Sequence, residues 1–157
     1  MRKTVLLIDD RIDDISWLVD DLNARGYEVD QVTNEKAARK KLEEIKKALG
    51  KGQRLFLLAI LDIMIPVMDI MELIDISDDF FEDSAKTGVR LCRYARKDLG
   101  ITEEELPIVS LTARSDDVEI RQELEEIGIQ GIFGRLPQSN EDNVRKCLDR
   151  FLAENGS

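Results

Sequence analysis

Three acidic residues directly follow or end apolar runs that have the length of β-strands. Asp9 and Asp10 follow the run 4–8 (TVLLI), and Asp62 ends the run 54–62 (RLFLLAILD). If these runs are neighbouring parallel strands, their carboxyl ends meet at the edge of the sheet where α/β proteins bind ligands. The three carboxylates then share one crevice, and Thr112 and Arg135 come to the same edge because they end or follow later apolar runs.

Three carboxylates in one crevice repel one another. Each pair 4 Å apart costs about 4 kcal/mol at an effective dielectric constant near 20. Either one acid keeps its proton or a cation binds. Oxygen ligands with room for water suit Mg²⁺, which also attracts phosphate oxygens and lets a neighbouring carboxylate attack phosphorus. Metal, hydroxyl and cation together would neutralise and orient a phosphoryl group on the carboxylate.

Composition excludes several other classes of chemistry. The 157 residues contain no histidine, which excludes a Ser-His-Asp site, a His-ligated zinc and a phosphohistidine carrier. The formal net charge of −10 argues against direct binding to nucleic acid or an anionic membrane. No apolar segment is long enough to span a membrane and the first residues do not read as a signal peptide, so we expect a cytoplasmic protein. Cys92 and Cys147 occupy apolar positions of predicted helices and are expected to be buried.

Strand and helix patterns alternate five times along the chain. This order predicts an α/β fold: a three-layer, doubly wound, five-stranded parallel sheet of the flavodoxin-like type with strand order 2-1-3-4-5. Thr33 is the expected cap of the second helix. The predicted strands are 4–8, 27–32, 54–62, 106–112 and 130–134, and the predicted helices are 11–25, 33–50, 87–100, 115–128 and 139–155.

A single domain is expected over residues 1–157, with an acidic insertion at about 67–87. Residues 67–86 hold seven acids and one lysine where the loop from strand to helix normally has about 2 to 6 residues. These acids are as compatible with a solvated face as with a partner site.

Three motifs carry a resemblance to a known family. VLLIDD (5–10), Asp62 with Pro66 four residues later, and PIVSLTAR (107–114) resemble the receiver domain of two-component response regulators. The resemblance implies that Asp62 accepts a phosphoryl group from the phosphohistidine of a sensor histidine kinase or a phosphotransfer protein. It also implies that Mg²⁺ is bound by Asp10, Asp62 and the backbone carbonyl of Met64, with Asp9 helping through water. Thr112, Ala113 and Arg135 would form the phosphate-binding and switch group.

The chain departs from the family pattern after the fifth strand. The family usually has Lys-Pro there, and this chain has GIFGRLPQS. Counting from Gly128 puts Arg135 in the lysine position, whereas counting back from Pro137 puts Leu136 there and supplies no cation. The first count also places Ile132 where the family often carries a switching aromatic residue, so Ile132 is a candidate for a weak switch position.

The main functional hypothesis is a phosphoacceptor signalling domain, which catalyses only its own phosphorylation and dephosphorylation. Its output would pass to an unidentified downstream protein or through homodimerisation. A receiver-like interaction module that works without phosphate is the alternative. A true phosphatase is less compatible, because such enzymes usually place a D-x-D pattern after the first strand and DDRIDD (9–14) lacks it there.

Overall fold

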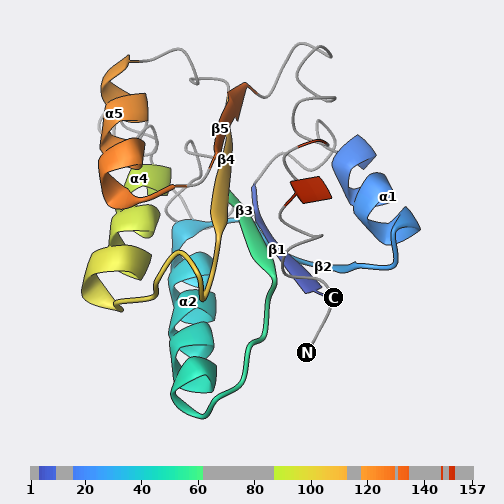
Figure 1. Cartoon of the computed structure of the whole chain (residues 1–157), viewed down its shortest axis with the longest axis horizontal. Helices are drawn as coiled ribbons and strands as arrows, with labels where there is room; N and C mark the ends of the chain where they lie inside the picture. Colours follow the sequence, from blue (N-terminus) through green and yellow to red (C-terminus); the bar gives the residue numbers. More distant parts are fainter. Residues whose placement is uncertain are drawn as a thin grey trace, which may run out of the picture.

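Five parallel strands form one sheet in the computed structural model of the chain (Figure 1). The structure describes residues 4–9, 16–61, 87–112, 118–129 and 131–134, together with Lys146, Asp149 and Arg150. The strand order is β2-β1-β3-β4-β5, which confirms the predicted fold class and topology. The strands are β1 (Thr4–Ile8), β2 (Glu28–Val32), β3 (Leu58–Leu61), β4 (Ile108–Thr112) and β5 (Gly131–Gly134).

Helices cover both faces of the sheet. Helix α1 (Ser16–Ala24) lies on one face. Helices α2 (Glu35–Gly50), α4 (Thr87–Arg93) and α5 (Val118–Ile127) lie on the other, and α4 continues directly into the π-helical turn η3 (Tyr94–Asp98) (Figure 1). This arrangement gives the three layers expected from the alternating sequence pattern.

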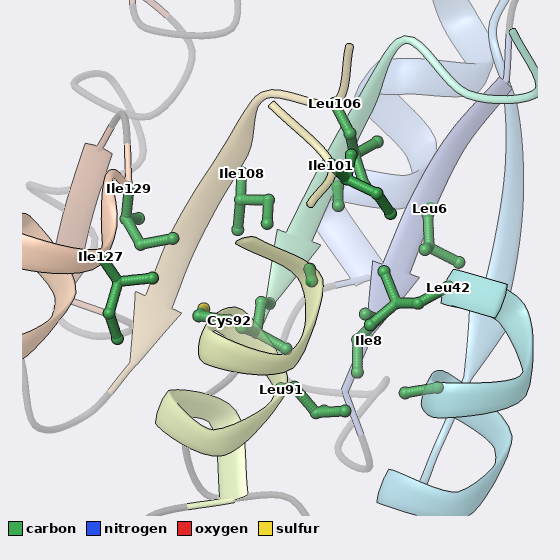
Figure 2. Packing of buried hydrophobic residues seen from close by; sticks show 14 of the residues in the cluster. Leu6, Ile8, Leu42, Leu91, Cys92, Ile101, Leu106, Ile108, Ile127 and Ile129 are labelled. Carbon is green, nitrogen blue, oxygen red and sulfur yellow. The ribbon is translucent and has the colours of Figure 1, made fainter. Parts of the chain in front are cut away.

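The central strands supply apolar side chains to two separate cores. In β1, Leu6 and Ile8 pack toward α2 and α4, whereas Val5 and Leu7 pack toward α1. Figure 2 shows Leu6 and Ile8 beside Leu42 of α2 and Leu91 of α4. All residues of β1 and β3 are buried, whereas β2, at the edge of the sheet, is partly exposed. The continuous apolar runs are therefore explained by strands that are covered on both faces.

The predicted cap of the second helix is wrong by one residue. Asn34, not Thr33, has the extended conformation of an N-cap, and its side chain accepts a hydrogen bond from the Ala37 N–H at 2.8 Å. An asparagine side chain at this position satisfies an N–H of the first turn that has no partner within the helix.

The third strand is shorter than predicted. The ladder begins at Leu58 rather than at residue 54, although Phe56 and Leu57 are already buried. The Arg54 guanidinium donates to the carbonyls of Phe56 and Leu57 at 3.2 and 3.3 Å. The apolar run therefore indicates which residues are buried rather than where the strand begins. The carbonyls of Phe56 and Leu57 are satisfied by Arg54 ahead of the ladder.

The helix predicted over 87–100 changes its hydrogen-bond register midway. After α4, the Leu99 N–H donates to the Tyr94 carbonyl five residues back. No helix in the described part of the chain is long and apolar enough to cross a membrane. Residues 67–86 of the predicted insertion lie outside the described residues, and only its last residue, Thr87, is described. Of the predicted last helix, only positions 146, 149 and 150 are described.

Candidate functional site

The backbone brings the ends of β1 and β3 together at the carboxyl edge of the sheet. The two strands are parallel neighbours, and Ile8 pairs with Leu61 in their register. The next residues in the sequence are Asp9 on one strand and Asp62 on the other. The adjacency on which the proposed crevice depends is therefore present, while Asp62 itself lies outside the described residues.

Asp9 is the one predicted metal-site residue whose side chain falls within the described part of the chain. It is 1% exposed, and its backbone N–H donates to the Val32 carbonyl at 3.0 Å, so hydrogen bonding with β2 continues one residue beyond β1. Burying a carboxylate is costly unless it is paired, hydrogen-bonded or bound to a metal. A carboxylate on a fixed backbone at a ligand-binding edge suits a hard cation such as Mg²⁺.

The last residues of β4 and β5 face each other across the ladder. Thr112 pairs with Gly134, and Ser110 pairs with Ile132. The described backbone thus puts Thr112 opposite the residue that precedes Arg135 in the sequence. Only the backbones of Thr112 and Ile132 are described, and Asp10, Met64, Ala113 and Arg135 lie, like Asp62, outside the described residues. Their roles therefore stay predictions.

A partly buried ion-pair cluster lies at the same edge, and its link to Arg90 was not predicted from the sequence. Glu35, the first residue of α2, is 7% exposed and accepts hydrogen bonds from Arg39 at 3.1 Å and from Arg90 at 2.9 Å. Arg90 also donates to the buried Thr87 hydroxyl at 3.2 Å. Glu35 and Thr87 are the first residues of α2 and α4, so the cluster ties together two helix starts at the carboxyl edge. The spacing of Glu35 and Arg39 was visible as an i,i+4 pair, but no local pattern points to Arg90.

Two buried side chains, Cys92 and Ser110, carry a thiol and a hydroxyl that could react. Cys92 is buried, as expected, and burial raises the pKa of its thiol to about 12, so it is protonated and unreactive near neutral pH. Ser110 is fully buried, and its hydroxyl has no hydrogen-bond partner. In the described ranges, no group of three His, Cys, Asp or Glu side chains is positioned to hold a metal ion.

Solved structures with the same architecture include receiver domains and chemotaxis response regulators. The chemotaxis protein CheY4 of Vibrio cholerae is 25% identical, with a TM-score of 0.62 over 97% of this chain and 100% of that chain. The signal receiver domain of a LuxO repressor protein from Vibrio parahaemolyticus is 15% identical, with a TM-score of 0.66 over 99% and 94%. The chain has the receiver-domain fold. A third receiver domain, from a sensor histidine kinase of Pseudomonas aeruginosa, is 20% identical, with a TM-score of 0.59 over 98% and 99%, and is described with a magnesium ion coordinated in its active-site cleft.

The receiver fold is recognised here from structure and short motifs. No protein-family model matches the sequence, and no curated protein is significantly similar to it. Both candidates for the lysine position after β5, Arg135 and Leu136, lie outside the described residues.

Proposed function

We propose that this receiver fold is a phosphoacceptor signalling domain in which Asp62 takes a phosphoryl group from the phosphohistidine of a sensor histidine kinase or a phosphotransfer protein. The pairing of Ile8 with Leu61, with buried Asp9 following β1, is the observation that carries the proposal. It supports a crevice in which Asp9, Asp10 and Asp62 meet. Residues 1–157 act as one cytoplasmic domain that includes the acidic insertion.

In this proposal Asp10, Asp62 and the Met64 carbonyl hold Mg²⁺, and Asp9 assists through water. The bound metal neutralises charge on the carboxylates and the incoming phosphoryl group. Thr112, Ala113 and Arg135 contact the phosphoryl oxygens, and Ile132 takes a weak part in the switch. Phosphorylation adds a charge of about −1.5 to −2, which biases the segments around β4 and β5 between two states. The output passes to a downstream protein or to a second copy of the chain.

Intact-mass measurement with a small phosphodonor and Mg²⁺ tests the proposal. We expect an adduct of about 80 Da on the wild-type chain and none on Asp62→Asn. Asp20→Asn, which removes an exposed carboxylate of α1, is the matched control and should still form the adduct. An adduct that persists in Asp62→Asn would contradict the assignment of the phosphoacceptor.

The second candidate is a receiver-like module that binds partners without phosphate. Two departures from the family pattern favour this alternative: the usual lysine after β5 is absent, and isoleucine stands at position 132. It predicts that no adduct forms and that titration calorimetry detects no Mg²⁺ binding.

A further inference from the structure

Positive charge is concentrated in two segments of this acidic protein. Residues 35–54 and 87–98 together hold 12 Lys and Arg against 4 Asp and Glu, whereas the rest of the chain holds 11 against 29. These two segments contain α2 and α4 with η3, which lie on the same face of the sheet (Figure 1). These two segments are therefore strongly basic although the whole chain has a net charge of −10.

Side-chain contacts join the two basic elements into one surface. The Tyr94 hydroxyl of η3 donates to Glu43 of α2 at 2.7 Å. The Arg39 guanidinium lies over the Tyr94 ring, 4.5 Å from its centroid, and Arg90 reaches Glu35. We call the exposed side of this pair of elements the basic face. It carries Lys36, Lys40 and Lys47 of α2, and Arg93 and Lys97 of α4 and η3 are also exposed, with Arg93 beside Glu123 of α5.

Three lysines of α2 lie on the side of the helix away from the core, with the exposed Glu43 between them. Lys36, Lys40 and Lys47 have spacings of four and seven residues, which place them on one side of the helix, opposite the buried Ala38, Leu42 and Ile45. In the described part of the chain no carboxylate forms an ion pair with Lys36, Lys40, Lys47 or Lys97, while Arg93 has a long contact of 3.8 Å with Glu123. These ammonium groups are therefore available to an external anion.

The chemistry of the basic face limits the kind of partner. Its exposed side chains are charged, and the one large exposed hydrophobic residue in the described ranges is Val118 of α5, so docking must be polar. A nucleic acid or an anionic membrane is an extended polyanion and would also feel the excess of acids on the rest of the molecule. A compact acidic helix or loop would contact the positive side alone.

We propose that the basic face of α2 and α4–η3 docks an acidic segment of another protein. Charge complementarity steers the encounter and fixes its orientation, and the binding weakens as salt rises. Docking does not require a phosphate on Asp62. The face remains linked to the candidate site, because both helices begin at the carboxyl edge and are tied there through Glu35 and Arg90.

The test uses the unphosphorylated full chain and a fluorescein-labelled peptide of glutamates and alanines. Fluorescence anisotropy should show binding that is lost between low and physiological ionic strength. Lys40→Gln/Lys47→Gln should weaken binding about fivefold or more, because two charges that face the acidic peptide are removed. The matched control is Lys146→Gln/Arg150→Gln, which removes two positive charges from exposed helical positions outside the basic face and should change binding less than about twofold. Thermal unfolding of both variants checks that each is folded.

Four outcomes would overturn the proposal. The first is the absence of peptide binding at low salt. The second is equal weakening in the two double variants, which would reflect net charge alone. The third is tighter binding of duplex DNA or phosphatidylserine vesicles than of the peptide, with loss in the α2 variant. The fourth is a salt-sensitive dimer in sedimentation that disappears in Lys40→Gln/Lys47→Gln, which would assign the face to a second copy. Because no phosphodonor is added, failure here leaves the assignment of Asp62 untouched.

Discussion

Glu35 illustrates how a single buried charge holds two helices at the candidate site. Its carboxylate accepts hydrogen bonds from Arg39 on its own helix and from Arg90 on α4. A buried ion pair adds little stability relative to an apolar substitute, but removing one partner leaves the other charge uncompensated. The contribution of Glu35 to stability is therefore measured by neutralising it, because the two guanidiniums then lose the anion that they bind.

We predict that Glu35→Gln lowers the free energy of unfolding by about 1–2 kcal/mol, because Arg90 and Arg39 lose the carboxylate but remain about one third exposed to water. Urea unfolding followed by circular dichroism measures the loss. Glu43→Gln on the same helix is the control. It removes a charge from an exposed residue that binds the Tyr94 hydroxyl and should cost about 0–1 kcal/mol. Equal losses in the two variants would show that the burial of Glu35 has no energetic consequence.

At the residue scale, the sequence predicted types of residue better than pairs of residues. The apolar position of Cys92 correctly predicted its burial, and Glu35 and Arg39 pair at the i,i+4 spacing of one helix face. Local spacing placed the helix cap on Thr33 instead of Asn34, because both residue types cap helices and only the backbone conformation decides between them. Arg90 was beyond its reach, since a contact across 55 residues depends on how two helices pack.

At the scale of elements, two helices end in the same way under different surroundings. Gly26 follows α1 with φ +88° and Gly128 follows α5 with φ +95°. In each case the next residue donates its N–H to a leucine carbonyl in the last turns, as Tyr27 does to Leu22. A Cβ at position 26 would meet open space, whereas one at position 128 would overlap the end of the Glu103 side chain.

We predict that Gly26→Ala and Gly128→Ala each destabilise the protein by about 1–2 kcal/mol, the cost of a left-handed conformation for a residue with a Cβ. Glu103 is exposed, and its terminal carboxylate can rotate away, so the overlap at position 128 should add little. Urea denaturation of both variants provides the comparison. If Gly128→Ala proves far more damaging and Glu103→Ala rescues it, the side chain is held more rigidly than we infer.

Element order and strand neighbours followed from the sequence, whereas several element ends did not. The continuous apolar runs at 4–8 and 54–62 correspond to central strands with two covered faces. The run at 54–62 begins earlier than the third strand, which starts at Leu58. Arg54 satisfies the carbonyls of Phe56 and Leu57 before the ladder begins. The π-helical register of η3 has no periodic signature over five residues and was read as ordinary helix.

Over the whole molecule, a buried acid lies at the carboxyl edge of the sheet, and several lysines lie on the exposed side of α2. Asp9 is buried at that edge, and Asp10 and Asp62 are adjacent in sequence to described residues there. The candidate site was predictable to the extent that strand order determines it, because β1 and β3 had to be neighbours for the acids to meet. The side chains that would complete it follow strand ends, where strand pairing no longer dictates their position.

If three carboxylates share this crevice, Mg²⁺ should stabilise the whole fold. At a metal concentration one hundred times the Kd, binding adds about 2.7 kcal/mol to the free energy of unfolding, which corresponds to a rise in Tm of about 5–10 °C for a chain of this size. Thermal unfolding with and without MgCl₂ measures this shift. NaCl at matched ionic strength separates it from general screening of the net charge of −10.

Asp9→Asn should then reduce the rise in melting temperature that Mg²⁺ produces. With Mg²⁺ it should gain less than wild type, since the cation meets one fewer negative charge. Asp20→Asn, which neutralises an exposed carboxylate of α1, should keep the full wild-type response. An equal Mg²⁺-dependent rise in Asp9→Asn and wild type would mean that Asp9 faces no metal and that its burial serves the fold alone.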